Sequence, residues 1–437
     1  MERKKYIQWS WPERAITFQL VFVLFERFFI QAGVSNAIIY ILDIINVYLL
    51  LNLFVGRIYQ KFSSLLLIYF GLIIGSLCIA FMNYLKYGNN ILFSVLEARN
   101  LIRFLIFFLS VTQYVKEEHL DKIFSIIEWH FIVNSLYIIY LYFTYFPETA
   151  SWMRGDLLNG FFGNMRGGNT FVNVEMLIVV VYNLIKWTQK EKSLKYLLMI
   201  TTLSIVVAGL IELKAYFIEV LVIYLWYVIF VKKSRKEKQL NIIIVSFGII
   251  AGFCAFRIMI REYPWFADVF TVKGLLEAVT SKNYSSVDDI NRFSGFSTIA
   301  EKMFGGNIVD ILFGIGLGNG AVSTIAGKRT LFSLKFANSN YSWFSGTHIF
   351  VQCGLIGLIL YISTFVVLLR KKKYNKYRTV SDIILLLSIF LVFYGEALKT
   401  DAGYLLYFAI GSGFMKNGIK KDSEGDLDVI IDNYTSL

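Results

Sequence analysis

The stretch "HIFVQCGLIGLILYISTFVVLL", residues 348–369, contains no Asp, Glu, Lys or Arg. A helix needs roughly 20 mostly apolar residues to cross a hydrocarbon core about 30 Å thick, so this stretch predicts a membrane span. The chain of 437 residues agrees, because 57% of its residues are hydrophobic and 17% are aromatic. These fractions exclude an ordinary soluble globular domain and predict an integral membrane protein.

The same criterion predicts an all-α polytopic membrane protein with about twelve transmembrane helices. The first nine helices occupy residues 1–258, a large extracytoplasmic loop occupies 259–347, the last three helices occupy 348–415, and a tail follows at 416–437. The predicted spans lie near residues 14–32, 35–55, 63–83, 91–115, 122–146, 171–187, 195–211, 214–231, 240–258, 348–369, 381–398 and 402–415.

Basic clusters determine the predicted orientation. They all fall on one side of the predicted spans, which the positive-inside rule assigns to the cytoplasm, so both termini and the tail are expected there. The net charge of +12 is then explained by these clusters, without a nucleic-acid partner. The clusters lie at residues 3–5, 56–61, 186–195, 232–238 and 370–378.

Two long connections are expected on the opposite, outer face, at 147–170 and 259–347. Within the longer one, apolar residues recur at near-helical spacing from 290 to 304, after Asp288 and Asp289, which suit a helix N-cap. Arg292 is then expected in the first turn of an outer-face helix, where it would complete a phosphate site. The alternative is a surface arginine paired with Asp288 or Asp289.

A glycine cluster follows in "FGIGLGNG", residues 313–320. No βαβ unit surrounds it, and it lies on the side away from nucleotides, so a dinucleotide-binding function is excluded. We expect a tight turn that returns the loop to the membrane.

The succession "NRFSGFSTIAEKMF…DILFGIGLGN…THIFVQCGLIGLILY", residues 291–361, resembles the C-terminal signature of the O-antigen polymerase and O-antigen ligase superfamily. In that pattern an arginine precedes an amphipathic segment, a glycine-rich turn follows, and a histidine or another polar residue stands just ahead of a "GxxGxxxY" span. Here these positions are Arg292, Gly314 to Gly318 and His348. "GLIELKAYFIEV" at 209–220 and "GNMRGGNTFVN" at 163–173 are weaker matches that point to Lys214 and Arg166, although Glu212, Leu213 and Arg166 itself depart from the family pattern.

The resemblance implies a fold of the lipid-linked glycosyltransferase type in the cytoplasmic membrane of a bacterium. It also implies transfer of a glycan from undecaprenyl pyrophosphate to a sugar hydroxyl on the outer face, without a cofactor. The implied partners are the lipid-linked oligosaccharide, membrane lipid, a chain-length regulator and a flippase. A ligase that transfers glycan to lipid A core, and a flippase or transporter for lipid-linked oligosaccharides, are the alternatives.

Cations are expected to hold the charge that grows on the leaving pyrophosphate. Arg292 is the leading candidate, and Arg154, Arg166 and Lys214 are further candidates on the outer face. Arg99 and Arg103 share a helix face inside a predicted span, where they either pair with glutamates on neighbouring helices or line a slot for the pyrophosphate.

His348 is the only histidine expected on the outer face, and we predict that it takes the proton of the acceptor hydroxyl. Glu212, beside Lys214, is the next candidate for that proton. His119 is expected to be solvated in a cytoplasmic loop, and His130 to make an interhelical hydrogen bond. No catalytic metal is expected, because the three histidines are far apart in the sequence.

Overall fold

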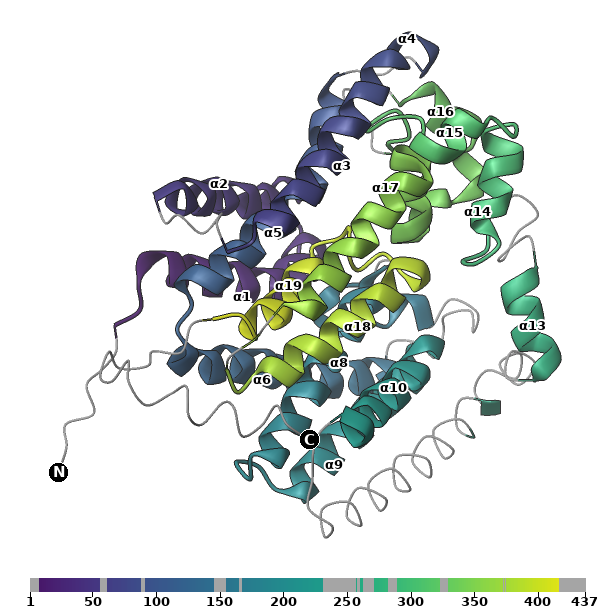
Figure 1. Ribbon diagram of the computed structural model, residues 1–437. Coiled ribbons are helices and arrows are strands. Elements are labelled where there is room, and N and C mark those ends of the chain that lie inside the picture. Colours follow the sequence, from purple (N-terminus) through teal and green to yellow (C-terminus); the bar gives the residue numbers. More distant parts are fainter. Residues whose placement is uncertain are drawn as a thin grey trace, which may run out of the picture.

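The computed structural model describes residues 8–55, 61–87, 91–144, 155–164, 167–230, 257, 260–261, 271–281, 289–322, 329–371, 373 and 375–415. In this part of the chain every regular element is a helix, and no strand occurs. The described part of the protein is therefore all-α, as the apolar segments predict. Figure 1 shows the helices collected into one bundle, with α4 and α14 to α16 at its upper end.

Helices coincide with eleven of the twelve predicted spans. The remaining segment, 240–258, lies almost wholly outside the described residues. These helices are α1 (Trp11–Gln31), α2 (Tyr40–Val55), α3 (Ser63–Met82), α5 (Ile91–Tyr114), α6 (Glu117–Thr144), α8 (Gly168–Thr188), α9 (Leu194–Leu210), α10 (Lys214–Phe230), α17 (Ser345–Arg370), α18 (Arg378–Tyr394) and α19 (Ala402–Ser412).

Five helical stretches of the described chain are long and apolar enough to cross a membrane. The described helices therefore make this a multi-pass membrane protein, with the other helices shorter or more charged. The five stretches are Asn36–Phe54, Ser63–Met82, Glu117–Thr144, Gly168–Thr188 and Ser345–Arg370.

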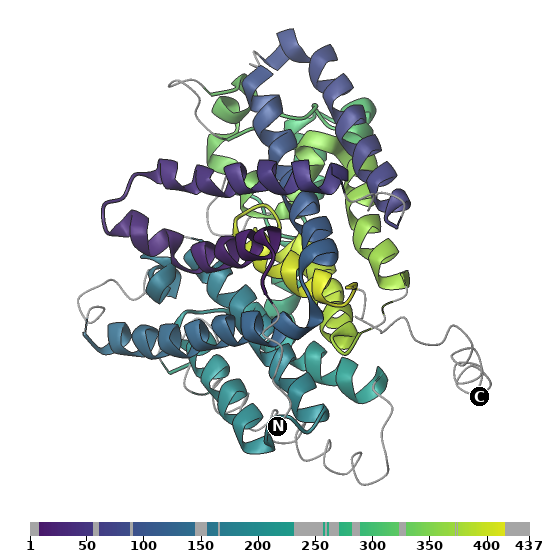
Figure 2. The same ribbon diagram turned by 90° about the vertical axis from the view of Figure 1, so that its left-hand side faces the viewer.

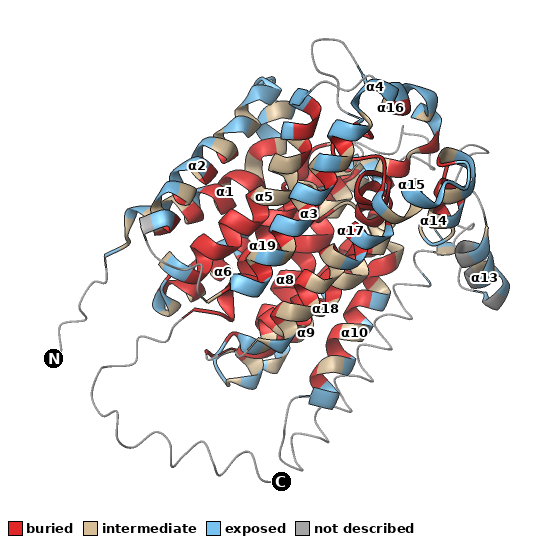
Figure 3. Ribbon diagram, turned by 45° about the horizontal axis from the view of Figure 1, so that its top comes forward, coloured by how far each residue is buried: buried red, intermediate tan, exposed pale blue. Residues whose placement is uncertain are grey.

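Helices α8 and α19 form the centre of the bundle. Every residue of α19 is buried, and α19 packs against α5, α8 and α18. Figure 3 shows α8 and α19 almost wholly in the colour of buried residues, whereas α2 and α3 expose much of their surface. Figure 2 shows α1 and α2 as a hairpin lying across α19. A helix that is apolar all round, such as α19, is stable only when other helices surround it.

Basic residues cluster at one end of the bundle. The Lys371 ammonium donates to the carbonyl oxygen of Lys61 over 2.8 Å, and Lys376 pairs with Asp121 at 2.9 Å. Lys186 also pairs with Asp121. The described parts of three basic clusters that are distant in sequence therefore lie at the same end of the molecule.

The predicted large loop folds over the other end of the bundle. Apart from α13, its main described elements pack around a small core that includes Ile299, Phe332 and Phe350. The elements are α13 (Val272–Thr280), α14 (Gly295–Thr298), a π-helical turn (Ile299–Met303), α15 (Ile308–Phe313), α16 (Leu331–Lys335) and 3₁₀ turns at Ala337–Ser339 and Tyr341–Trp343.

The predicted position of Arg292 in a helix is wrong. The helix begins at Gly295 after Ser294, so Arg292 precedes it, and Asp289 is not its N-cap; Asp288 lies outside the described residues. The backbone N–H of Arg292 donates to the side chain of Asn291 over 2.6 Å. The Asn291 amide in turn donates to the Ser281 hydroxyl over 2.8 Å. A side chain that bonds nearby backbone in this way competes with helix formation, which delays the helix start.

Candidate functional site

Helix α17 is broken at Gly354, whose φ of 68° and ψ of −169° interrupt the helical backbone. The break frees carbonyl groups on the preceding turn, which must find donors elsewhere. The N–H groups of Ile315 and Gly316 supply them, donating over 3.0 Å to the carbonyl oxygens of Val351 and Gln352. The glycine-rich segment therefore completes the broken helix and is not merely a turn back to the membrane.

The glycines are needed because this segment approaches neighbouring backbones closely. A Cβ at Gly316 would lie 2.3 Å from the backbone of Ala80 in α3. A Cβ at Gly318 would lie 2.4 Å from the backbone nitrogen of Ser94 in α5. Both glycines also have positive φ, at 97° and 93°, which disfavours any side chain. The segment is thus wedged between α3, α5 and α17.

This wedge places His348 beside two polar residues. His348 and Gln352 lie one turn apart on the first half of α17, and their Nε2 atoms are 2.7 Å apart. Nε2 of His348 is also 3.2 Å from Oε2 of Glu97, which comes from α5. Gln352 Oε1 accepts from the backbone N–H of Gly318 over 2.7 Å. All of these side chains are buried, so their polar contacts with one another replace contacts with water.

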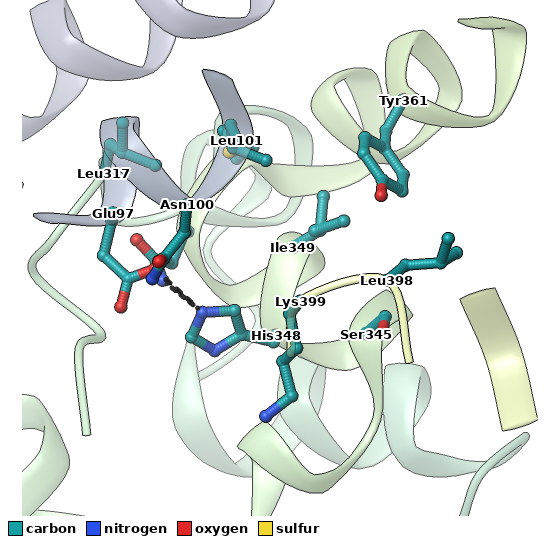
Figure 4. A pocket seen from close by; sticks show the side chains of 12 residues that line it. Glu97, Asn100, Leu101, Leu317, Ser345, His348, Ile349, Tyr361, Leu398 and Lys399 are labelled. Atoms are coloured by element: carbon teal, nitrogen blue, oxygen red, sulfur yellow. Dashed lines mark hydrogen bonds and ion pairs between the residues drawn. The ribbon is translucent and has the colours of Figure 1, made fainter. Parts of the chain in front are cut away.

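A small, partly open pocket lies beside His348. Glu97 and Asn100 from α5 face the imidazole, and Lys399 extends past it from the connection between α18 and α19 (Figure 4). The rest of the lining is largely apolar, which suits a ligand with one polar and one hydrocarbon part. These apolar residues are Leu101, Leu317, Ile349, Cys353, Tyr361 and Leu398.

Arg99 and Arg103 are occupied by aspartates on other elements. Arg99 Nε lies 2.7 Å from Asp43 of α2, and Arg103 forms a buried ion pair with Asp401. Arg103 also donates to the carbonyl oxygen of Lys399 over 2.7 Å, which anchors the loop that carries that lysine. Of the two predicted roles, the structure shows pairing, although with aspartates instead of glutamates.

A second polar cluster contains Glu212, Lys214 and Arg292. Glu212 has φ of 54°, an uncommon value for a residue other than glycine, where the chain turns from α9 into α10. The charges of Glu212, Arg292 and Asp156 all act on the ammonium of Lys214. Burial raises the pKa of Glu212 to about 7, while Lys214 opposes the rise and Asp156 adds to it. This carboxyl group therefore titrates near neutral pH.

Arg292 lies over an aromatic surface. Its guanidinium carbon is 4.0 Å from the centre of the Tyr394 ring and 5.4 Å from that of Phe344. Phe344 immediately precedes α17, and the N–H of Ser345 donates to the carbonyl oxygen of Gly395 over 2.8 Å. Arg292 and His348 thus both lie at the N-terminal end of α17. Arg154 and Arg166 lie outside the described residues.

The other two histidines lie away from this site. The expectation that His119 is solvated is wrong, because it is buried, hydrogen-bonds to Glu13 over 2.7 Å and stacks on Trp9. The carboxylate of Glu13 and the ring of Trp9 replace the contacts with water that His119 loses on burial. The sequence around His119 does not reveal these two partners. His130 of α6 hydrogen-bonds to Glu175 of α8, which confirms the predicted interhelical bond.

The sequence analysis did not assign Glu97, Gln352 or Lys399 to the site. Gln352 had a usable signal, because a residue four positions after His348 shares its helix face. Lys399 stands between the last two predicted spans, which also places it at the end of the bundle where His348 lies.

No protein-family model, curated protein or solved structure matches the chain.

Proposed function

We propose that the protein is a polysaccharide polymerase. It transfers a glycan chain from undecaprenyl pyrophosphate to the terminal sugar of a lipid-linked repeat unit on the outer face of the cytoplasmic membrane. The observation that carries this proposal is the buried His348, held by Glu97 and Gln352 beside a pocket with one lysine and a largely apolar lining. Such a pocket suits the pyrophosphate and the adjoining hydrocarbon of a lipid carrier.

The proposed orientation follows from the two ends of the bundle. The end that gathers Lys186, Lys371 and Lys376 is assigned to the cytoplasm, because basic residues are retained on that side. His348 and the folded loop are then on the outer face. With twelve spans, both termini are cytoplasmic.

The reaction requires one bond to form and one to break. The oxygen of the acceptor hydroxyl bonds to the anomeric carbon, the bond from that carbon to the pyrophosphate oxygen breaks, and its electron pair stays on the pyrophosphate. Lys399, Lys214 and Arg292 are the proposed cations for this growing charge, since fixed charges act strongly where water is excluded. The hydroxyl proton passes to a base, for which the sequence offers His348 and Glu212.

Polymerisation by purified protein in lipid vesicles tests the proposal. Lipid-linked repeat units should be converted into a ladder of longer chains. His348→Gln should lower the rate at least roughly 10²-fold, whether the imidazole takes the proton or donates to the pyrophosphate. Arg292→Lys should also be impaired, because lysine keeps the charge but loses the planar guanidinium that lies over Tyr394.

The matched control is His119→Gln, the same substitution at a buried histidine away from the site, and it should retain the ladder. Absence of chain growth in the wild type, or full activity in His348→Gln, would contradict the proposal. Transfer only to lipid A core in the same assay would identify a ligase.

A transporter of lipid-linked glycans is the second candidate, and the buried charges inside the bundle favour it. Arg103, which pairs with Asp401, and His130 and Glu175, which bond to each other, lie within predicted spans where charges are costly. Movement of labelled lipid-linked glycan between leaflets without chain growth would support this candidate over the polymerase.

A further inference from the structure

The carboxamide of Gln352 contacts three groups at once. Its oxygen faces the backbone N–H of Gly318 at 2.7 Å, and its nitrogen faces Nε2 of His348, also at 2.7 Å. The same side chain hydrogen-bonds Glu97. Every polar atom of the amide is therefore used, which leaves Gln352 little freedom to rotate.

The orientation of this amide follows from Gly318. A backbone N–H can only donate a hydrogen bond, so it requires the oxygen of Gln352 opposite to it. Exchanging the oxygen and nitrogen of the amide would set two donors against each other at 2.7 Å. The NH₂ group of Gln352 must therefore face His348.

An amide NH₂ group can only donate, so Nε2 of His348 has to accept. A neutral imidazole that accepts at Nε2 carries its hydrogen on Nδ1. A hydrogen on Nε2 would suit Glu97 at 3.2 Å but would collide with the closer Gln352.

We propose that Gly318 and Gln352 hold His348 in the tautomer with its hydrogen on Nδ1. His348 then meets a pyrophosphate oxygen of the donor substrate as a hydrogen-bond donor, and not as the base. The ligand in this statement rests on the proposed function, whereas the tautomer rests on the hydrogen bonds alone. Gln352 is a positioning residue that acts through His348.

The environment of Nδ1 agrees with this role. Nδ1 of His348 is buried and has no hydrogen-bond partner among the described residues. A buried donor without a partner is costly, and an oxygen of a bound ligand would satisfy it. His348 also lines the pocket that would hold this ligand.

The proton of the acceptor hydroxyl then needs a different acceptor. Glu212 is the other base named for this reaction above, and Oε1 of its carboxyl group is buried without a hydrogen-bond partner in the part of the chain that is described. In the balanced step, the hydroxyl proton goes to the Glu212 carboxylate while the electron pair of the broken bond stays on the pyrophosphate. His348 keeps its hydrogen throughout.

Nitrogen NMR of protein labelled with [¹⁵N]histidine tests the tautomer directly. The chain has three histidines, so the spectrum is simple, and the signals missing in His348→Gln identify His348. The wild-type protein should show a protonated Nδ1 and a bare Nε2 for His348. A protonated Nε2 would overturn the tautomer assignment, whatever the protein's activity.

Gln352→Met tests the cause, because methionine has a similar length and no amide. Nε2 of His348 should then gain the hydrogen and donate it to Glu97, which reverses the two nitrogen signals. Gln189→Met, at the opposite end of the bundle, is the matched control and should leave the His348 signals unchanged. An unchanged tautomer in folded Gln352→Met would refute the positioning role, and the wild-type spectrum still decides the tautomer if that variant does not fold.

Inorganic pyrophosphate tests the donor role without any need for catalysis. Its addition to wild-type protein should shift the Nδ1 signal of His348 and leave that of His119 in place. A His348 spectrum that does not respond at any concentration tolerated by the protein would overturn the donor role but not the tautomer. Failure of the polymerase assay alone would affect only the proposed function.

Discussion

Gly354→Ala should separate the architecture of the site from the rest of the fold. An added Cβ would lie 2.4 Å from the backbone nitrogen of Gly314 and from the carbonyl group of Leu312. The positive φ of 68° would be strained as well. Backbone strain costs about 1–3 kcal/mol and overpacking costs about 1–3 kcal/mol. Together they should lower the free energy of unfolding by roughly 2–6 kcal/mol.

The protein can avoid part of this cost if α17 straightens. The carbonyl groups of Val351 and Gln352 would then bond within the helix and release Ile315 and Gly316, and His348 would lose its position beside Glu97. Activity should therefore fall even in molecules that stay folded.

Two assays distinguish these effects from general damage. Unfolding in mixed detergent micelles measures the free energy, and chain growth in vesicles measures activity. Gly75→Ala is the matched control, because a Cβ there meets nothing within 4 Å. If Gly354→Ala changed the free energy of unfolding by less than about 1 kcal/mol and kept full activity, the proposed function of the break would be refuted.

Three further outcomes are expected. The pKa of Glu212 is raised to about 7, so its neutral form contributes stability that is fully present below about pH 4.5 and is lost as the pH rises through 7. The free energies of unfolding of the wild type and of Glu212→Gln, measured across that range, should therefore differ in their pH dependence. Parallel curves would contradict this prediction. Chain growth should persist in EDTA because cationic side chains are assigned to the pyrophosphate, and loss restored by Mg²⁺ would contradict this. In a cysteine-free background, an impermeant thiol reagent applied to intact cells should label Glu301→Cys and not Arg378→Cys, and the reverse would invert the orientation.

The helical fold was largely predictable from the sequence because it depends on local patterns. Long apolar segments separated by charged or polar residues give helix positions directly, and the structure has helices at almost all of them. The start of α14 was predicted five residues too early, at 290 instead of Gly295, because the competing bonds of Asn291 involve Ser281, ten residues away. Periodicity within a helix carries no information about such contacts.

The site was only partly predictable, for the same physical reason. His348 stood out by residue type and position, but its partner Glu97 is 251 residues away in the sequence. The break at Gly354 is also hidden, since glycines in an apolar segment equally suit close helix packing. Arg99 and Arg103 were conspicuous in the sequence, but their aspartate partners could be identified only once α2 and the start of α19 had been placed beside α5.

The wedge between α3, α5 and α17 also determines the order in which the protein can be completed during synthesis. The backbone of Leu317 bonds to both neighbouring helices. Its N–H donates to the carbonyl oxygen of Ser76 in α3 over 3.1 Å, and its carbonyl oxygen accepts from the hydroxyl of Ser94 in α5 over 2.7 Å. Helices α3 and α5 leave the ribosome long before this segment exists. The hydrogen bonds that join α3 and α5 through Leu317 can therefore form only after residues 314–318 have been made.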